Sequence, residues 1–253
     1  MTMKILLLDI ETAPNRVYAW GLWDQNIYID QIEEPGYTMC WAAKWLGDKE
    51  VIFSSRQETT MEKMVKKIWD LIDEADAVIH YNGTKFDMPT LNKEFITYGL
   101  SKPAPYKQID LLRTARSQFR FPSNKLDYVT QYLGLEGKLE HKGMSLWRDC
   151  MAGKDAAWKI MKKYNIQDVK ILEDLYRRLL PWIPNHPNVN LYDESTTPRC
   201  PKCGGKHLQK RGFAYTPTMV YQRYQCQTCK SWSRERTNSM DKEKKRSLLV
   251  ETK

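Results

Sequence analysis

The sequence contains no long hydrophobic run, and this absence excludes several classes of protein. No apolar stretch approaches the roughly 18 residues that a membrane-spanning helix requires. The first apolar run, Ile5 to Leu8, ends at Asp9 and is shorter than the about 7–15 residues of a signal-peptide core. There is no internal repeat, and an apolar fraction of 42% with 28% charged residues argues against a fibrous or largely disordered chain. We therefore expect a soluble, cytoplasmic protein without a membrane partner.

Positive charge is concentrated at the C-terminal end of the chain. The 253 residues carry a formal net charge of +9, of which residues 191–253 hold +8 and residues 1–190 only +1. A near-neutral body with a basic end is typical of an appended module that contacts a polyanion. A solubilising tail would give the same imbalance, so charge alone leaves both interpretations open.

Hydrophobic periodicity predicts strands interleaved with helices. We expect strands at residues 4–9, 37–46, 50–54, 77–81 and 106–109, and helices at 58–73, 88–98 and 155–180. This order predicts an α/β sheet with helices on its faces. We expect a first domain at residues 1–183, a proline-punctuated linker at 184–198, a cysteine-containing module at 199–234 and a charged flexible tail at 235–253.

Two carboxylates lie at the end of the first predicted strand. Side chains two residues apart on a strand point to the same side, so Asp9 and Glu11 would project together. Adjacent carboxylates resist ionisation unless a cation joins them, and an oxygen-seeking ion such as Mg²⁺ or Mn²⁺ would do so. The alternative is that both acids simply enter solvent at a strand end.

A third carboxylate interrupts the apolar stripe of the helix predicted at 155–180. Asp168 falls in the same sector as Met161 and Leu172, with Tyr164 one turn before it. A carboxylate on a buried stripe is costly unless it is paired or bound to a metal. We favour a metal ligand with a neighbouring hydroxyl over an aspartate in a salt bridge at the edge of the stripe.

The segment VIHYNGTKFDMPTLN, residues 78–92, carries a fourth acid between these two regions. Asn82-Gly83 is a turn signal, and Asp87 stands just before the helix predicted to begin near Met88. Asp87 would cap that helix in the simplest interpretation. Asn82 and Phe86 offer a hydrogen-bonding group and a stacking face suited to a nucleotide.

Taken together, three segments resemble the motifs of the DEDD 3′–5′ exonucleases. They are LLLDIET at residues 6–12, NGTKFD at 82–87, and the stretch from Tyr164 to Asp168. A tyrosine four residues before the last aspartate is typical of the DEDDy subgroup. Residues 108–135 look like the exonuclease domains of B-family DNA polymerases, and the resemblance covers about residues 4–180. No polymerase domain follows in the sequence, so we expect a freestanding nuclease.

The resemblance implies a fold, a set of cofactors and roles for individual residues. It implies a ribonuclease H-like mixed five-stranded sheet flanked by helices, and two Mg²⁺ or Mn²⁺ ions held by Asp9, Glu11 and Asp168 with support from Asp87. Tyr164 would orient the attacking water. Thr12, Asn82 and Phe86 would hold the terminal nucleotide. Asp110 is a rival for one carboxylate role, but we expect it to be structural.

The function that follows is phosphodiester hydrolysis at single-stranded or frayed 3′ ends by a two-metal mechanism. DNA is the preferred substrate, RNA is possible, and replication or repair proteins are candidate partners. The alternatives are a 3′–5′ exoribonuclease, a structure-specific endonuclease and a non-catalytic nucleic-acid-binding protein on a nuclease fold.

Two Cys-x-x-Cys pairs lie in the basic end of the chain. Without a secretory signal, Cys200, Cys203, Cys226 and Cys229 fit a structural Zn²⁺ site better than disulfides. We predict a zinc ribbon with a hairpin at residues 215–224, whose folding depends on the metal because so short a segment has little core. Cys40 and Cys150 are isolated and are expected to be small buried hydrophobic residues.

Basic and aromatic side chains alternate around these cysteines, which favours nucleic-acid binding by phosphate contacts and base stacking. The alternative is that the aromatic residues form the core of the ribbon and the charges only solvate it. The basic residues are Lys202, Lys206, Lys210, Arg211, Arg223, Lys230, Arg234 and Arg236. A second aromatic group, Tyr18, Trp20 and Trp23, follows the first carboxylate motif and either stacks on bases or packs against the body.

Overall fold

The computed structural model describes residues 2–137, 139 and 143–250. Contacts divide the chain into two units, one of residues 4–176 and the other of residues 1–3 and 177–253. The division falls inside the long helix α6 (Asp155–Leu179), ahead of the linker expected at 184–198. The two units are described separately below.

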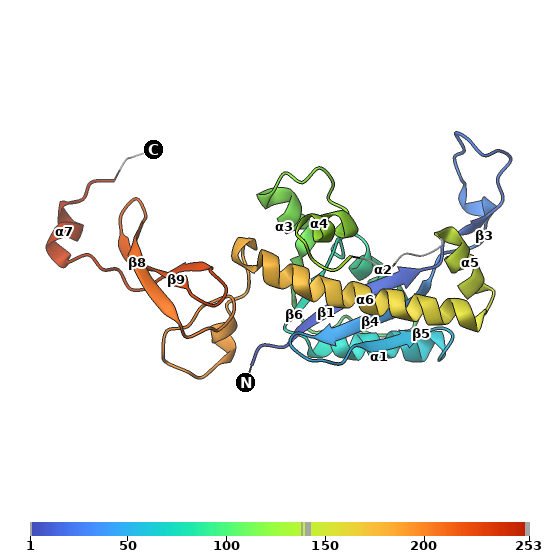
Figure 1. The fold of residues 1–253 in the computed structure, drawn as a ribbon, viewed down its shortest axis with the longest axis horizontal. Helices are drawn as coiled ribbons and strands as arrows, with labels where there is room; N and C mark the ends of the chain where they lie inside the picture. Colours follow the sequence, from blue (N-terminus) through green and yellow to red (C-terminus); the bar gives the residue numbers. More distant parts are fainter. Residues whose placement is uncertain (1, 138, 140–142, 251–253) are drawn as a thin grey trace. The chain divides into compact units, whose positions relative to one another are not determined.

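A five-stranded mixed sheet forms the centre of the first unit (Figure 1). Its order is β5-β4-β1-β6-β7, with β1 antiparallel to β4 and parallel to β6. The fold class expected for this unit from the sequence is therefore confirmed. The strands are β1 (Ile5–Thr12), β4 (Thr38–Trp45), β5 (Ile52–Ser55), β6 (Ala77–His80) and β7 (Lys107–Asp110).

The apolar start of β1 is buried on both faces because helices cover both sides of the sheet. Leu6, Leu8 and Ile10 pack on one side against α1 (Met61–Glu74) and α2 (Asp87–Thr97). Helix α1 presents an apolar stripe at helical spacing, and the Thr60 side chain caps its first turn by accepting a hydrogen bond from the Lys63 N–H. Alternate side chains of β1, from Leu6 to Ile10, are therefore buried in this core.

Helices α5 (Met144–Met151) and α6 cover the other face (Figure 1). Met39 and Cys40 of the sheet pack there against residues of both helices, including Met161 and Tyr164. Lys44 of β4 forms a buried ion pair with Glu173 of α6, which adds a polar connection between helix and sheet. Cys40 and Cys150 are 0% and 2% exposed, as expected of small buried hydrophobic residues.

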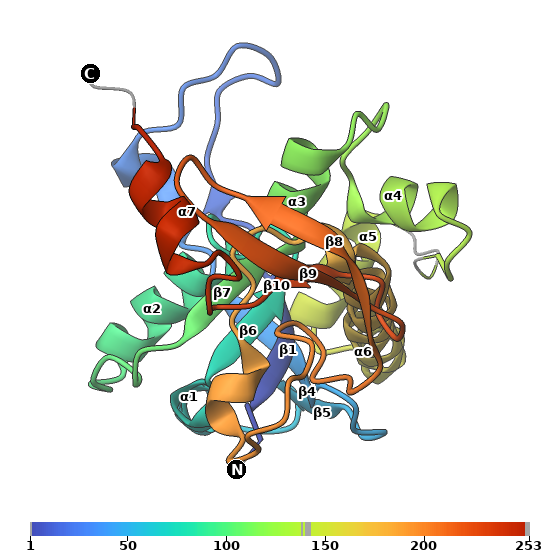
Figure 2. The same cartoon turned by 90° about the vertical axis from the view of Figure 1, so that its left-hand side faces the viewer.

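A projecting loop follows β1 and was not expected as a defined element. The short strands β2 (Arg16–Val17) and β3 (Ile32–Glu34) pair at its base, and the 3₁₀ helix η1 (Ile29–Gln31) precedes β3. The loop extends away from the rest of its unit (Figures 1 and 2). Trp20 is 98% exposed and Trp23 84%, so the alternative in which these rings pack against the body is wrong.

Helices α3 (Leu111–Gln118) and α4 (Leu126–Tyr132) complete the described helices of the first unit. The second unit contains a three-stranded sheet in the order β10-β9-β8 (Figure 2). The elements of this unit are η2 (Leu180–Trp182), η3 (Val189–Tyr192), β8 (Leu208–Tyr215), β9 (Val220–Cys226), β10 (Trp232–Arg234) and α7 (Lys242–Ser247).

The hairpin of the second unit is longer than the 215–224 predicted from the sequence. Its strands β8 and β9 span residues 208–226, and residues 216–219 form the turn. Most of β8 is exposed on both faces, so its sequence lacks the apolar–polar alternation that would have identified the strand. The segment predicted as a flexible tail contains α7, and its residues 251–253 lie outside the described part of the chain.

Lys202 has a different role from the phosphate contact predicted for it. Its ammonium group donates to the carbonyl oxygens of Leu180, Pro181 and Ile183 at 3.1, 2.9 and 2.8 Å. These carbonyls lie at the end of a helical segment, where backbone acceptors lack partners within the helix. Burial lowers the pKa of Lys202. All three ammonium protons are therefore used in holding the chain, and none is available to a phosphate.

No helix among the described residues combines the length and hydrophobicity needed to cross a lipid bilayer.

Candidate functional site

Strand β1 places two carboxylates on one side of the sheet. Asp9 and Glu11 pair across the ladder with Ala42 and Cys40 of β4 and share a face, whereas Ile10 between them points into the opposite core. The pairing register between β1 and β4 shifts between Glu11 and Thr12, as it does at a β-bulge. Such a shift changes the direction of the side chains that follow. Both carboxylates are only partly buried.

Helix α6 brings Asp168 to the same place. The carboxylate oxygens of Asp9, Glu11 and Asp168 lie within 4.8 Å of one another. Asp168 is 1% exposed and belongs to the buried stripe of α6 that contains Met161 and Tyr164. The structure thus brings together three acids separated by up to 159 positions in the sequence.

Asn165 was not singled out from the sequence, yet it contacts this group directly. Its side-chain amide donates to the Asp9 carboxylate at 2.7 Å and to the Asp9 carbonyl at 3.3 Å. Asn165 is fully buried on α6, three residues before Asp168 and therefore on the same face. The sequence did contain a signal for Asn165, because it is a second polar residue on the otherwise apolar stripe of the helix.

The negative potential of the three acids also affects their surroundings. Burial raises the pKa of Cys40 well above its usual value, and the charges of Glu11 and Asp9 raise it further. Three carboxylates so close together repel unless a cation or protons neutralise them. An all-oxygen donor set suits a hard divalent cation such as Mg²⁺ or Mn²⁺. The residues present therefore fit such an ion.

Asp87 is not part of the three-acid cluster, but it contacts the strand that carries two of the acids. It is the first residue of α2, is 3% exposed, and its Oδ1 accepts a hydrogen bond from the Ile10 N–H at 3.2 Å. Ile10 stands between Asp9 and Glu11 in the sequence, so this bond holds Asp87 against β1 at the level of the two acids. The side chain thus connects α2 to β1.

The turn that leads to Asp87 depends on a close backbone approach at Gly83. A Cβ at that position would lie 2.4 Å from Cγ of His80, a contact that no other residue could accommodate unchanged. The Gly83 N–H donates to Nδ1 of His80, and burial lowers the pKa of that histidine. His80 is therefore neutral, and its 3.8 Å approach to Asp110 is not an ion pair.

Asp110 has a structural role in the same turn. Its Oδ1 accepts hydrogen bonds from the backbone N–H groups of Asn82 and Leu112, both at 3.0 Å. The first bond fixes Asn82, whose φ of +69° lies in the left-handed region, and the second caps α3. The carboxylate is thus satisfied within the fold, as expected of a structural residue.

The remaining residues with a predicted role at the site differ in how exposed their side chains are. Tyr164 is 7% exposed and packs edge-on against Trp147, with ring centroids 6.2 Å apart. Phe86 is 45% exposed at the start of α2, and Thr12 and Asn82 are half-buried. An exposed ring at a helix start is available for stacking, whereas the buried Tyr164 ring is held rigidly.

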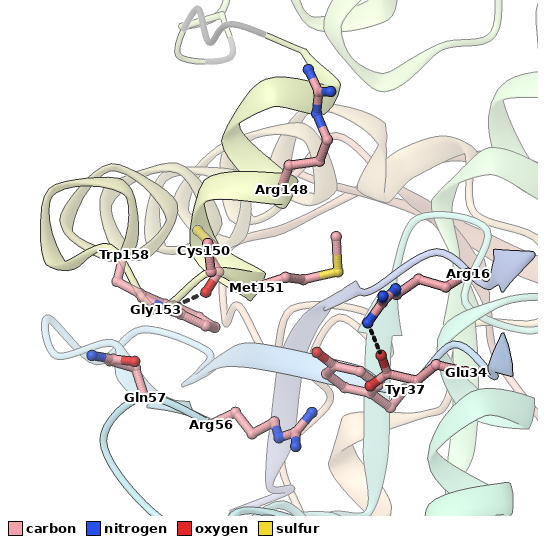
Figure 3. Close-up of a pocket in the computed structure, with 11 residues that line it drawn as sticks. Arg16, Glu34, Tyr37, Arg56, Gln57, Arg148, Cys150, Met151, Gly153 and Trp158 are labelled. Atoms are coloured by element: carbon pink, nitrogen blue, oxygen red, sulfur yellow. Dashed lines mark hydrogen bonds and ion pairs between the residues drawn. The ribbon is translucent and has the colours of Figure 1, made fainter.

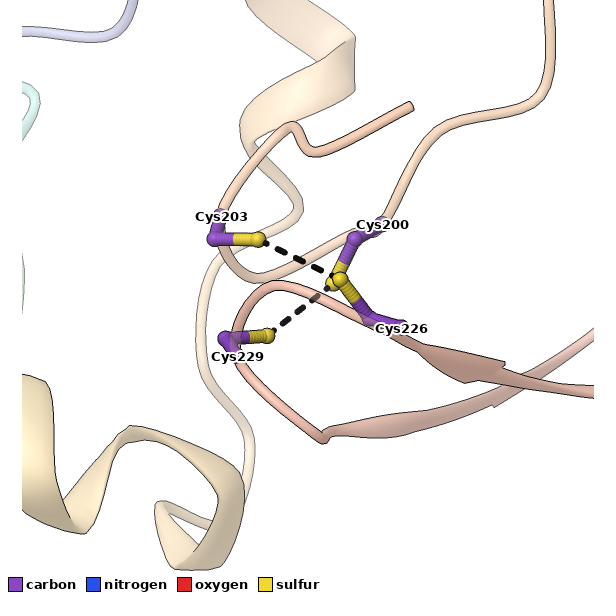
Figure 4. A group of neighbouring side chains, drawn as sticks. All are labelled: Cys200, Cys203, Cys226 and Cys229. Atoms are coloured by element: carbon purple, nitrogen blue, oxygen red, sulfur yellow. Dashed lines mark hydrogen bonds between the residues drawn. The ribbon is translucent and has the colours of Figure 1, made fainter. Parts of the chain in front are cut away.

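Four cysteines form a second cluster, in the ribbon (Figure 4). Their sulfur atoms lie within 4.8 Å of one another, with Cys200–Cys229 at 3.5 Å and Cys203–Cys226 at 3.6 Å. Zn–S bonds of about 2.3 Å in a tetrahedron give sulfur separations of roughly 3.8 Å. The four thiols therefore fit a Zn²⁺ ion, and the second unit is compatible with a zinc ribbon.

The thiols of this cluster differ in acidity. Burial raises the pKa of Cys200 to about 11. Burial also acts on Cys226, but hydrogen bonds from the backbone of Cys229 and Thr228 outweigh it and lower its pKa to about 7. The backbone at Gly205 lies close to the cluster, since a Cβ there would be 3.0 Å from Oγ1 of Thr228 and 3.2 Å from the Cys203 sulfur. A cation in the cluster would displace the remaining thiol protons.

The sheet order, the helices on both faces and the clustered acids together define a nuclease-type α/β fold with a candidate divalent-metal centre. The model of the RNase_H superfamily matches residues 6–180, more than half of the chain, and the chain belongs to that superfamily. Nucleases of this superfamily use divalent metals, which agrees with the donor set described above.

A solved structure shares this fold. The family B DNA polymerase from the hyperthermophilic archaeon Pyrobaculum calidifontis matches with a TM-score of 0.52 at 18% identity. The match covers 71% of this chain but only 25% of the polymerase. A comparison with curated proteins returns no match. At this identity the likeness establishes the fold alone.

Zinc removal provides a test of the ribbon. We expect one equivalent of Zn²⁺ per chain, and we expect its chelation to abolish the hydrogen-exchange protection of β8 and β9. Zinc affinity should fall as the pH is lowered, because protons compete for thiols that must ionise to bind the metal. Cys226→Ser should lose the zinc and Cys150→Ala should retain it. Retention of zinc by Cys226→Ser, measured by metal analysis, would contradict the assignment.

Proposed function

We propose that the protein is a metal-dependent 3′–5′ exonuclease that hydrolyses DNA at single-stranded or frayed 3′ ends. The observation that carries the proposal is the meeting of Asp9, Glu11 and Asp168 on one face of a ribonuclease H-like sheet. Phosphodiester hydrolysis requires charge neutralisation at the phosphate and an activated water. Two divalent cations, when bound, supply both.

The residues of the chain bind the cations and orient the attacking water. Asp9, Glu11 and Asp168 bind the cations, with Asp87 in support from the start of α2. Asn165 fixes the rotamer of Asp9 through its 2.7 Å hydrogen bond, so the ligand is pre-oriented. Tyr164, held by Trp147, positions the attacking water through its hydroxyl.

The 3′–5′ polarity and the DNA preference are supported by sequence and fold resemblance. The motifs around Asp9, Asp87 and Asp168 resemble those of DEDDy exonucleases, and the fold matches part of a family B DNA polymerase. Thr12, Asn82 and the exposed ring of Phe86 would hold the terminal nucleotide. RNA remains the alternative substrate because the carboxylates act on the phosphate and discriminate little between ribose and deoxyribose.

Asp168→Asn tests the catalytic proposal directly. Loss of residues that only orient a metal ligand costs about 10–100-fold, so loss of the ligand charge should lower kcat/KM by more than about 100-fold. The assay follows 5′-labelled single-stranded DNA and RNA of equal sequence in Mg²⁺, Mn²⁺ or EDTA. Asp174→Asn, an exposed acid on the same helix, is the matched control and should retain full activity.

Each outcome of that assay has a defined meaning. A metal-dependent ladder that shortens from the 3′ end and disappears in Asp168→Asn supports the exonuclease. Internal cleavage products indicate an endonuclease instead. Faster digestion of RNA than of DNA overturns the DNA preference. Tight binding without cleavage by the wild type would reject catalysis altogether.

The zinc ribbon is proposed to aid substrate binding through one face of its sheet. The register pairs Arg234 with Arg223 and Trp232 with Gln225, so these side chains share a face. The guanidinium carbon of Arg223 lies 4.8 Å from the centroid of Trp232, and that of Arg234 lies 3.8 Å from the centroid of Tyr221. Within the described residues, no ion pair joins either arginine to a carboxylate. Arginine and aromatic planes of this kind suit phosphates and bases of a single strand.

Arg223→Gln should weaken binding of single-stranded DNA by the full chain and lower the slope of log K against log salt by about 0.7, the value for one phosphate contact on a single strand. Lys210→Gln removes one charge from the opposite face of the sheet, where Lys210 pairs with Tyr224, and should leave the slope unchanged. Equal effects of the two variants in fluorescence anisotropy would reject the assignment of this face.

The exposed loop aromatics offer a further stacking platform. Trp20→Ala and Trp23→Ala should each weaken single-strand binding by about 1–3 kcal/mol if a base stacks on the ring. Their high exposure predicts changes in the free energy of unfolding within about 0.5 kcal/mol. Leu22→Ala in the same loop is the control, because it removes apolar surface without an aromatic face. Unchanged affinity in both tryptophan variants would leave the platform without support.

A further inference from the structure

A surface pocket of about 510 Å³ in the first unit lies among α5, the end of β5 and the base of the projecting loop (Figure 3). The guanidinium of Arg148 points away from the other lining side chains, and Arg16 is paired with Glu34 at 3.2 Å. Arg56 lies over the ring of Tyr37, 4.2 Å from its centroid. The charged side chains are thus engaged within the protein or turned outward, and the pocket indicates no ligand.

One charged pair in the interior of the first unit has no part in the proposed chemistry. The Lys44 ammonium on β4 is paired with the Glu173 carboxylate on α6, and the two side chains are only 11% and 8% exposed. Within the described residues, Lys44 forms no other ion pair. Removing two charges from water costs about as much as their attraction returns, so such a pair adds little stability. A buried pair can instead select one register between the two elements that it joins.

Lys44 lies on the same face of the sheet as two of the clustered acids. It faces Leu7 in the ladder, two residues before Asp9, and stands two residues beyond Ala42, the partner of Asp9. Side chains two residues apart on a strand share a face. Lys44 is therefore displaced by about 7 Å along the strand from the level of Asp9.

Helix α6 is held to this face by polar contacts on both sides of Asp168 in the sequence. Asn165 donates to the Asp9 carboxylate at 2.7 Å, and Glu173 pairs with Lys44. The two contacts are separated by about 12 Å along the helix and by about 80° around its axis, from the rise and turn of eight residues. Apolar packing is not directional, whereas two separated polar contacts resist both sliding and rotation of the helix.

The position of α6 decides whether Asp168 can join the other acids. A slip by one residue moves a helical side chain by about 1.5 Å along the axis and about 100° around it. Such a slip would take Asp168 out of the group in which the carboxylate oxygens lie within 4.8 Å. Repulsion among the carboxylates favours this separation before a cation binds, so a restraint on the helix is needed.

We propose that the Lys44–Glu173 ion pair is a positioning element that fixes the register of α6 on the sheet, so that Asp168 meets Asp9 and Glu11. The inference rests on the proposed function, because it concerns the cations that these acids would hold. The pair itself binds neither cation nor substrate. It acts through α6 by keeping three candidate ligands at the spacing that the structure shows.

The decisive variant replaces both partners with apolar residues of similar size, Lys44→Met with Glu173→Leu. Removing one partner would leave an uncompensated buried charge, whereas replacing both preserves a packed interior. The double change removes one charge of each sign, so the net charge of the chain stays the same. In the zinc-loaded full chain we expect an unchanged unfolding temperature and Mn²⁺ binding that is about 10-fold weaker, as when groups that orient a ligand are lost.

An exposed ion pair on the same helix provides the matched control. Lys162 and Glu58 are paired at 2.8 Å, but their side chains are 47% and 45% exposed. Lys162→Met with Glu58→Leu should leave Mn²⁺ affinity unchanged in isothermal titration. On single-stranded DNA, the Lys44/Glu173 double variant should lower kcat about 10-fold with KM unchanged, because the strand still binds while the acids are misplaced.

Equal Mn²⁺ affinity in the wild type and the folded Lys44/Glu173 double variant would overturn the proposal, as would an equal loss in the control pair. A second apolar combination, Lys44→Leu with Glu173→Met, serves the same test if the first does not fold. If neither folds, the pair is required for stability and the positioning role is rejected.

Failure of the proposed function gives a different result. Mn²⁺ binding by the wild type without cleavage would reject the nuclease, and weaker Mn²⁺ binding by the Lys44/Glu173 double variant would still support the positioning role. Cleavage by the wild type with unaltered kcat in that variant would reject the positioning role alone. Absence of Mn²⁺ binding by the wild type would overturn both.

Discussion

The mutual repulsion of Asp9, Glu11 and Asp168 is the constraint on which the rest of the structure depends. Their carboxylate oxygens lie within 4.8 Å of one another, and negative charges this close oppose the fold unless a cation or protons neutralise them. The packing of β1 between two helical layers and the apolar stripe of α6 hold the acids together against this force. A bound cation would make this arrangement favourable, and the fold presents the three carboxylates as a preformed set of candidate ligands.

Charge is unevenly distributed along the chain. The net +9 first suggested a basic end on a neutral body, and the ribbon does carry an arginine-rich face around Trp232 and Tyr221. Within the near-neutral unit, however, the carboxylates of Asp9, Glu11 and Asp168 lie together. A net charge close to zero therefore conceals a local negative potential, which suits a divalent cation.

Patterns with a strong period or spacing were predictable, and features made by single contacts were not. The five strands of the central sheet, the helices α1 and α6, and the stripe containing Asp168 follow from hydrophobic periodicity because burial repeats along each element. Strand β8 is exposed, so no such signal marked its start. Lys202 resembled any other surface lysine in sequence, yet its charge is used on three carbonyl groups of its own unit.

The sequence by itself determined the fold class, the four candidate acids and the four cysteines, because each depends on local periodicity, spacing or a resembling motif. Tertiary structure alone decided which acids meet, that Asn165 orients Asp9, and that Asp110 holds a turn. It also decided that Trp20 and Trp23 face solvent. The physical reason is that these relations join side chains far apart in the chain, whose distances are set by how helices pack on the sheet.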